Sequence, residues 1–249
     1  MKTKKSVSRH YNKISHLYDN RYTGLLGKYF RAIEENYILQ AVDFKNKKAL
    51  DLGTGTGRFA FLLADKAQKV VGIDNSVKMI AVAKSKLKKI NKKNVSFQEM
   101  DAENLAFKEN SFDIVLAIGL FEYIKNLSPF LTEIKRVLKE NGCLIFTILN
   151  KNWFWKRKSG KNQYGYSLAE HDLARIKKVL QALNFQLINF QGVFFIPKRN
   201  LLLQTSQKVG LGRVCLKIIV GLDKLLNKLP AVRKRAGVFI ISSRKTKNF

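Results

Sequence analysis

Short apolar runs alternate with segments of helical periodicity along most of the chain. The runs are apolar throughout rather than at every second position, as in FDIVLAI at 112–118 and CLIFTIL at 143–149. Between 76 and 90, by contrast, apolar residues recur every three or four positions. Strands that are apolar on both faces and alternate with helices are typical of a parallel sheet covered on both sides. We therefore predict an α/β fold with a doubly wound sheet.

The pattern also predicts where the elements lie. Strands are expected at 48–52, 69–73, 95–100, 112–118, 143–149, 185–195 and 237–242. Helices are expected at 58–67, 76–90, 128–138 and 168–183. In the third of these, Ser128 is interpreted as the N-cap, and Asn141 with Gly142 as the stop.

The length of 249 residues fits a single domain over 1–249, and the pattern divides it into four parts. We expect a helical cap at 1–46, a core at 47–195, an amphipathic helical insertion at 196–236, and a final strand with a basic tail at 237–249. A long loop at 150–167 is aromatic and basic, and contains Trp153, Phe154 and Trp155.

The insertion contains one strongly amphipathic stretch that ends at Pro230. Basic residues occupy one side of the predicted helix. Its apolar face is formed by Leu211, Val214, Cys215, Ile218, Ile219, Leu222, Leu225, Leu226 and Leu229. A basic amphipathic helix of this kind either packs on the domain as a lid or lies on a membrane surface. Both interpretations remain open at this point.

Charge is distributed unevenly along the chain. The sequence has 47 Lys plus Arg against 18 Asp plus Glu, a formal charge of +29, and segment 196–249 alone has 13 basic residues and one acidic residue. Such asymmetry favours a polyanionic neighbour, either a nucleic acid or an anionic membrane. The alternative is that the lysine content reflects the codon bias of an A/T-rich genome and has no functional consequence.

The two cysteines, Cys143 and Cys215, exclude a disulfide framework and a Cys-rich zinc module, and they fit a reducing compartment. The start of the chain has no signal-peptide core, and no apolar stretch reaches the ~18 residues that a membrane span needs. We therefore expect a cytoplasmic protein, with peripheral membrane contact as an open alternative.

The stretch ALDLGTGTGRFA at 49–60 carries the candidate chemistry. Asp51 ends an apolar run, and Gly53, Gly55 and Gly57 then turn the chain into a helix. Glycine is favoured where the backbone must turn with positive φ and where a ligand approaches the main chain closely. Asp74 follows at the end of the next predicted strand, where an acid can accept the two hydroxyls of a ribose. The sequence therefore predicts a nucleoside site.

The spacing of the three glycines argues against a dinucleotide-binding site. The fingerprint for one is G-x-G-x-x-G, whereas this chain has G-x-G-x-G. Asp51, Asp74 and Asp101 would gather at the ends of neighbouring strands, where they would repel a pyrophosphate and attract a cation. We infer a nucleoside that bears positive charge.

These motifs, in this order from about Tyr11 to Leu149, resemble the class I S-adenosylmethionine-dependent methyltransferases. The resemblance implies a Rossmann-like seven-stranded sheet, mostly parallel with the last strand antiparallel, and S-adenosylmethionine as cofactor. It implies that Asp51 and the three glycines hold the methionine part, and that Asp74 binds the ribose. The remaining cofactor residues it implies are Asn75 and Met79 beside the adenine, Asp101 and Ala102 at its amino group, Ile118 at the end of the fourth strand, and Tyr11 and Tyr18 in a closing cap.

Methyl transfer is an in-line displacement that alignment and exclusion of water can accelerate without a base. If a base exists, Glu122 and Tyr123 are the candidates, since both follow the fourth predicted strand. For Glu122 we favour a structural role as a helix-opening acid that interacts with the helix dipole. No metal site is predicted, because the three histidines lack the spacing of metal ligands.

Three hypotheses for the acceptor remain. The first is a small-molecule or lipid-like acceptor, because the layout is similar to the ubiquinone and menaquinone C-methyltransferase group. The second is an RNA or protein acceptor that the basic flanks would bind. The end of the fourth strand, IGLF, lacks the motif of N6-adenine enzymes, which disfavours a nucleic acid. The third is a cofactor-binding regulator without turnover. We favour the first, with an anionic membrane as a further partner, and the sequence leaves the oligomeric state open.

Overall fold

The computed structural model describes residues 4–153, 168–193 and 225–246, together with Val214, Ile218, Gly221 and Leu222. The expected aromatic residues Phe154 and Trp155 lie outside the described residues, as does most of the expected insertion. In the described residues, none of the helices has the length and apolar character to cross a bilayer.

The described strands are β1 (Lys48–Leu52), β2 (Lys69–Asp74), β3 (Val95–Glu99), β4 (Phe112–Ala117), β5 (Leu138–Asn150), β6 (Glu170–His171), β7 (Phe185–Val193) and β8 (Val238–Lys245). The described helices are α1 (Lys4–Ile14), α2 (Leu25–Ala41), α3 (Arg58–Ala64), α4 (Val77–Ile90), α5 (Leu127–Val137), α6 (Leu173–Ala182) and α9 (Pro230–Arg233), with short 3-10 helices η1 (Tyr18–Tyr22) and η2 (Phe121–Tyr123).

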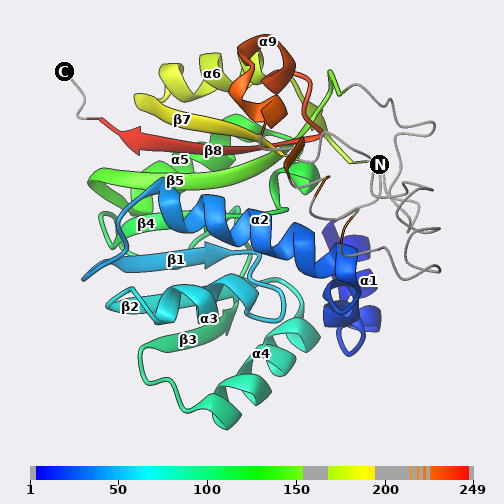
Figure 1. The fold of residues 1–249 in the computed structure, drawn as a ribbon. Helices are drawn as coiled ribbons and strands as arrows, with labels where there is room; N and C mark the ends of the chain where they lie inside the picture. The colour runs from blue at the N-terminus through cyan, green and yellow to red at the C-terminus, as the bar shows by residue number, and fades with distance from the viewer. Residues whose placement is uncertain are drawn as a thin grey trace.

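The strands form one twisted sheet in the order β3-β2-β1-β4-β5-β8-β7 (Figure 1). Neighbouring strands are parallel except for β8, which runs antiparallel to both β5 and β7. The predicted doubly wound parallel sheet with an antiparallel last strand is thus confirmed. The prediction of seven strands omitted β6, a two-residue strand that pairs with the end of β5.

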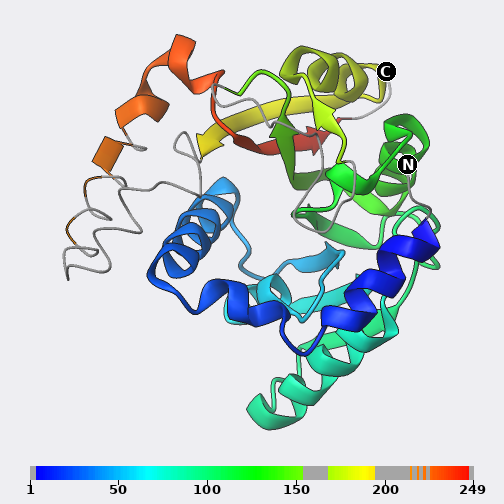
Figure 2. The ribbon, with the colours of Figure 1, turned by 90° about the vertical axis from the view of Figure 1, so that its right-hand side faces the viewer.

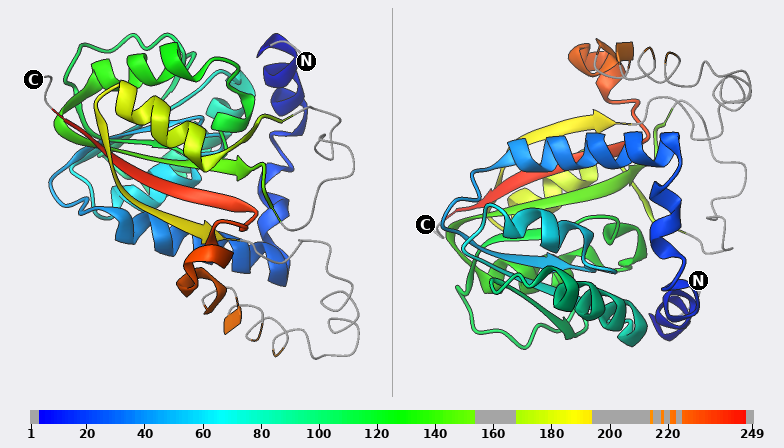
Figure 3. Two further views of the ribbon diagram at one scale, coloured as in Figure 1. Left: turned by 90° about the horizontal axis from the view of Figure 1, so that it is seen from above. Right: turned by 60° about the horizontal axis from the view of Figure 1, so that its bottom comes forward.

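Helices cover both faces of the sheet, and each face has its own apolar core. The core between the sheet and α5 and α6 includes Phe121, Phe130 and Phe146. The core on the opposite face packs α2, α3 and α4 against the same strands. Figure 3 shows α5 and α6 on one side of the sheet and α2 on the other. Burial of both faces explains why the central strands β1, β2, β4 and β5 are mostly apolar, whereas the edge strands β3 and β7 contain more polar residues.

Several boundaries differ from the sequence prediction. The helix expected at 58–67 ends at Ala64, and the helix expected at 168–183 begins only at Leu173, because Glu170–His171 form β6 and the Asp172 side chain caps α6. Helix α5 is capped by Asn126, whose side chain accepts a hydrogen bond from the Ser128 backbone N–H, so Ser128 is not the N-cap. Strand β5 already begins at Leu138, and Asn141 adopts a left-handed φ of 62° within it. The residues expected to stop the helix therefore lie inside an irregular strand start, where the β4–β5 register shifts.

The N-terminal cap consists of α1, η1 and α2. Helix α1 crosses the edge of the sheet toward which β1 points (Figures 1 and 2). This is the carboxyl edge of the parallel strands, where ligands bind in open α/β sheets. The expected division of the chain into four parts stays a prediction.

Candidate functional site

The turn after β1 is built from three left-handed glycines. Gly53, Gly55 and Gly57 have φ of 67°, 56° and 87°, a region that other residues rarely adopt. Gly57 is the N-cap of α3, so the helix begins directly after the turn. The predicted strand, glycine turn and helix are therefore all present in the structure.

Space as well as φ favours glycine at Gly57, whereas at Gly55 only φ does. A Cβ on Gly57 would lie 2.8 Å from the rings of Phe61 and Phe97, too close for a real contact. A Cβ on Gly55 would lie at an ordinary 3.6 Å from the Tyr18 ring of the cap. Gly57 is thus needed for packing, whereas Gly55 leaves its backbone open beside Tyr18.

Asp51 is buried under the glycine turn. Its Oδ2 accepts a hydrogen bond of 2.6 Å from the Thr54 hydroxyl, and only 2% of the residue is exposed. Burial raises the pKa of Asp51 to about 7, while the Thr54 hydrogen bond and the charge of Arg58 oppose the rise. A buried carboxyl of this kind favours a positively charged partner nearby.

Asp74 at the end of β2 faces the same turn. One carboxylate oxygen accepts the Gly55 N–H and the other accepts the Ser76 N–H, both at 2.9 Å. Burial raises the pKa of Asp74, and these two hydrogen bonds oppose the rise. Each carboxylate oxygen has a second lone pair, so the group could accept ligand hydroxyls in addition. The structure therefore brings Asp74 against the glycine turn, as predicted.

Asp101 follows β3 next to Asp74. The Met100 N–H donates to the Asp74 backbone carbonyl at 3.1 Å, and Asp101 Oδ1 accepts the Glu103 N–H at 2.9 Å. Ala102 is partly buried against the core. The loop that carries Asp101 and Ala102 thus begins beside Asp74.

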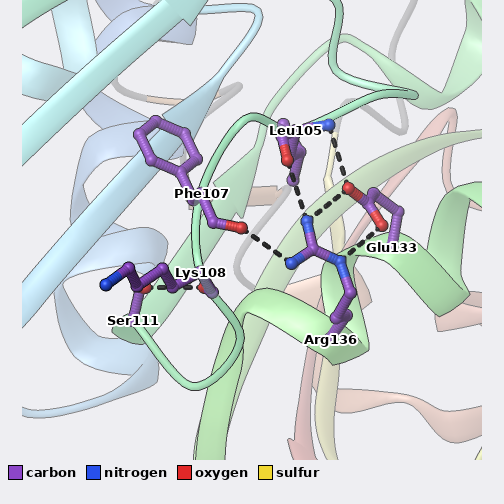
Figure 4. A network of polar contacts seen from close by, with 6 residues as sticks. All are labelled: Leu105, Phe107, Lys108, Ser111, Glu133 and Arg136. Carbon is purple, nitrogen blue, oxygen red and sulfur yellow. Dashed lines mark hydrogen bonds and ion pairs between the residues drawn. The ribbon is translucent and has the colours of Figure 1, made fainter.

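A side-chain network fixes the next part of this loop (Figure 4). The Arg136 guanidinium of α5 donates to the carbonyls of Leu105 and Phe107 at 2.8 and 2.7 Å. Glu133 accepts from Arg136 and also accepts the Leu105 N–H at 2.9 Å. The Arg136 hydrogen bond is the main cause that lowers the pKa of Glu133. Helix α5 therefore holds the loop that carries Asp101.

The two residues expected beside an adenine occupy different environments. Asn75 is exposed, and its carbonyl accepts a hydrogen bond of 2.8 Å from the Ser8 hydroxyl of α1. Met79 is 1% exposed, so packing already covers its side chain. Their contact with a ligand stays a prediction.

Tyrosines from the cap meet the segment after β4. The Tyr11 and Tyr123 hydroxyls are 2.8 Å apart, and their ring centroids are 6.0 Å apart at a steep angle. Tyr11 also packs edge-on against Tyr18, with centroids 5.9 Å apart. The two cap tyrosines and Tyr123, predicted from distant parts of the sequence, therefore form one cluster at the carboxyl edge.

The residues that follow β4 lie at the same carboxyl edge of the sheet. Ile118 packs against the core of the α2 face, and Gly119 turns the chain with a φ of 68°. Glu122 lies in the first turn of η2, and its Oε1 would be 3.7 Å from a Cβ on Gly119. Both candidate bases, Glu122 and Tyr123, are thus at the site's edge, and their roles stay predictions.

Sequence reasoning missed two polar links between the cap and the core. Asn12 Oδ1 accepts the Ser76 hydroxyl at 2.7 Å and the Lys78 N–H at 3.1 Å, which joins α1 to the start of α4. Asp19 accepts the Thr56 hydroxyl at 2.7 Å and forms an ion pair with Lys86. Asn12 and Asp19 lie in the segment that contains the paired tyrosines, but the sequence around them has no signal that identifies their partners.

A family model described as a methyltransferase domain matches residues 43–248. The chain is 35% identical over 150 residues to a demethylmenaquinone methyltransferase of Thermotoga maritima, a match that covers 58% of this chain and 62% of that protein. It is 35% identical over 127 residues to a ubiquinone biosynthesis O-methyltransferase of Pelagibacter ubique, covering 49% and 52%. The chain thus spans little more than half the length of these curated relatives.

A similar solved structure is that of Haemonchus contortus phosphoethanolamine N-methyltransferase 1, in complex with phosphoethanolamine and S-adenosylhomocysteine. The TM-score is 0.67 at 17% identity, and the match covers 98% of this chain and 49% of that chain. At this identity the likeness establishes the fold, which agrees with the sheet and helices described above.

Proposed function

The chain belongs to the methyltransferase domain family of class I S-adenosylmethionine-dependent enzymes, and from this premise we propose that it methylates a small-molecule or lipid-like acceptor. The observation that carries the proposal is the carboxyl edge of β1 and β2. There, a turn of three left-handed glycines lies against Asp74 and under the Tyr18 ring. This combination provides an open backbone, carboxylates and an aromatic cover.

The residues at this edge fit S-adenosylmethionine on two observations. The left-handed glycine turn presents backbone without side chains where the methionine part would lie. The carboxyls of Asp51 and Asp74 are withdrawn from water, and burial raises the pKa of both, so a cation is a favourable neighbour. The spare lone pairs of Asp74 suit the hydroxyls of a ribose.

When bound, the cofactor would supply a methyl group on a positively charged sulfur: the bond from the acceptor nucleophile to the methyl carbon would form as the sulfur–methyl bond breaks, leaving the sulfur as a neutral thioether. In our proposal Asp74 and Asp101 orient the nucleoside, and Tyr11 and Tyr18 close the edge against water. Alignment and dehydration then supply most of the rate enhancement. An acceptor that must lose a proton would require a base, for which Glu122 and Tyr123 stay the candidates.

The cap supports a small acceptor. Helix α1 crosses the carboxyl edge and is fastened there by Asn12 and by the Tyr11–Tyr123 hydroxyl pair. A polymer would have to reach a methyl group behind this helix, whereas a small molecule needs only a gap beside it. The names of the two quinone-pathway relatives are in line with an apolar, ring-bearing acceptor.

The test is a transfer assay with the full chain and S-adenosylmethionine labelled in the methyl group. Lipid, small-metabolite, RNA and protein fractions of a cell extract are offered separately. The Asp74→Ala variant, assayed with the cofactor at a concentration below its Kd for the native chain, is the negative control. Asp65→Asn is the matched control, because Asp65 is an exposed carboxylate at the end of α3, outside the site.

We expect label in the lipid or small-metabolite fraction with the native chain and with Asp65→Asn, and much less label with Asp74→Ala. Label that appears only in RNA or protein would refute the acceptor class while leaving methyl transfer intact. Cofactor binding without label in any fraction would favour a regulator without turnover.

A further inference from the structure

Five large apolar side chains near the C-terminal end of the chain are exposed to solvent. They are Val214, Ile218, Leu222, Leu225 and Leu229, each between 43% and 56% exposed. They are three or four residues apart, the spacing that places side chains on one face of a helix, and each of the first four is helical. We call these five residues the apolar stripe.

The opposite side of this segment is anchored to the body of the protein. Asn227 is buried, and its Oδ1 accepts the Gly192 N–H of β7 at 3.1 Å. Its Nδ2 donates to the Gln191 side chain at 2.6 Å and to the Tyr37 hydroxyl of α2 at 3.2 Å. Since Asn227 lies two residues from both Leu225 and Leu229, its anchor turns these leucines away from the body.

The anchor explains why Leu225 and Leu229 do not pack on the body of the protein. Leu226, beside Asn227, packs against the core of the α5 and α6 face, whereas Leu225 and Leu229 remain about half exposed. Exposed apolar residues arranged as a stripe, rather than scattered singly, indicate an interaction surface. The orange segment that carries Leu225 and Leu229 lies at the outside of the molecule, beyond β7 (Figure 2).

The topology places this surface on the same edge of the sheet as the candidate site. Strand β7 is parallel to the central strands and ends at their carboxyl edge, at Val193. Strand β8 is antiparallel and begins at that edge, at Val238. The chain between these two residues therefore leaves and rejoins the sheet where the glycine turn lies.

The charge around the apolar stripe indicates which kind of partner this surface binds. Segment 196–249 has 13 basic residues and one acidic residue, and the exposed residues next to the stripe include Lys228, Lys234 and Arg235. An apolar helix face flanked by cations is complementary to a bilayer with anionic headgroups, which offers both hydrocarbon and negative charge. We propose that the apolar stripe docks the protein on an anionic membrane surface, with the carboxyl edge of the sheet turned toward the lipid.

Docking on a membrane is independent of the proposed transfer reaction, so the test needs neither cofactor nor acceptor. Purified full-length protein, with no cofactor, is sedimented with vesicles of phosphatidylcholine alone and with vesicles of phosphatidylcholine and phosphatidylglycerol in equal parts. We expect binding to the anionic vesicles at low salt, weaker binding as salt screens the lysines, and little binding to the neutral vesicles.

The decisive variant is Leu222→Ser/Leu225→Ser/Leu229→Ser. All three side chains are at least 43% exposed, so the fold should tolerate the changes, and circular dichroism checks that it does. We expect binding to anionic vesicles to fall about tenfold or more, because three apolar side chains no longer enter the interface. The matched control is Ile90→Ser, which removes a side chain of 47% exposure from the end of α4 and should leave binding unchanged.

A native chain that does not sediment with anionic vesicles at low salt overturns the proposal. An equal loss of binding in Ile90→Ser, or unchanged binding in the triple variant, overturns the assignment to the stripe. Retention on single-stranded RNA that the triple substitution abolishes, without any vesicle binding, would assign the surface to a nucleic acid instead.

Discussion

The hydroxyls of Tyr11 in the N-terminal helix and Tyr123 in η2 are 2.8 Å apart, although the two residues are 112 positions apart in the chain. The pair joins the cap to the segment that follows β4. A neutral hydrogen bond of this kind contributes about 1 kcal/mol net. It is therefore one of several weak links that hold the cap on the core, beside those of Asn12 and Asp19.

Tyr11→Phe should loosen the cap over the cofactor. If closure is coupled to binding, the loss of about 1 kcal/mol corresponds to a roughly fivefold rise in the Kd of S-adenosylmethionine. Titration calorimetry measures it. Tyr37→Phe is the control, since Tyr37 accepts its hydrogen bond from Asn227, far from the site. A lowered melting temperature with an unchanged Kd for Tyr11→Phe would contradict the coupling.

Asp74→Ala should weaken cofactor binding by about 1 to 3 kcal/mol, the usual loss when charge-assisted hydrogen bonds are removed. Asp74→Asn should give a smaller loss, because the amide oxygen can still accept one of the two backbone N–H groups. Calorimetry with both variants tests the order. Equal affinity in the native protein and in Asp74→Ala would remove Asp74 from the site.

The two glycines Gly55 and Gly57 should respond differently to alanine. Gly57→Ala places a Cβ 2.8 Å from two phenylalanine rings, so it should lower the free energy of unfolding by about 1 to 3 kcal/mol. Gly55→Ala strains the backbone at its φ of 56° but meets an ordinary contact distance, so it should destabilise the fold less than Gly57→Ala and should in addition raise the Kd for the cofactor. Chemical denaturation together with calorimetry separates the two effects, and the reverse pattern would contradict the geometry.

The raised pKa of Asp51 predicts how stability varies with pH. The native carboxyl keeps its proton up to about pH 7, whereas the unfolded one loses it near its ordinary pKa of 3.8. Between these values the native state binds more protons, so stability falls by about 1.4 kcal/mol per pH unit as pH rises, and levels off above the native pKa.

Denaturant titrations at about pH 5 and about pH 8 measure this slope, and Asp51→Asn should reduce it. Some slope should remain, because burial raises the pKa of Asp74 as well. Stability that rises over this range in the native protein, or an identical slope in Asp51→Asn, would contradict the assignment.

Arg136→Met should release the loop after β3. The loop would lose the bonds from the guanidinium to the Leu105 and Phe107 carbonyls, and Asp101 at its start would be held less firmly. We expect a cofactor Kd that is about threefold to tenfold higher. Arg136→Lys should not restore it, because a single ammonium group cannot reach both carbonyls and Glu133 as the planar guanidinium does.

The control for Arg136 is Arg31→Met, which removes an exposed ion pair with Glu35 on α2. Exposed pairs of this type contribute about 0 to 1 kcal/mol, so both stability and cofactor binding should stay nearly unchanged. A loss of stability in Arg136→Met without any change in Kd would make the network purely structural.

The parts of the fold that local sequence determines were predicted from it. The glycine turn was found because positive φ restricts the residue type at Gly53, Gly55 and Gly57. The strands were found because burial on both faces demands continuous apolar runs. The N-cap of α5 was wrong by two positions, since Asn126 and Ser128 are both good caps and only the backbone decides between them.

Contacts between distant residues were not predictable in the same way. Asn12 reaches Ser76 across 64 positions, and Arg136 reaches Leu105 across 31. Asparagine and arginine are common on surfaces, so neither residue stands out in the sequence until the fold places it. Strand β6 was missed because two residues carry no periodicity.

The reversal of β8 also has a consequence for how this architecture can diversify. Fifteen residue pairs hold β8 between β5 and β7 along most of its length, so the position of β8 does not depend on what connects β7 to β8. An insertion between Val193 and Val238 leaves and rejoins the sheet at its carboxyl edge, whatever its length. This connection could therefore vary among related proteins without a change in the order of the strands.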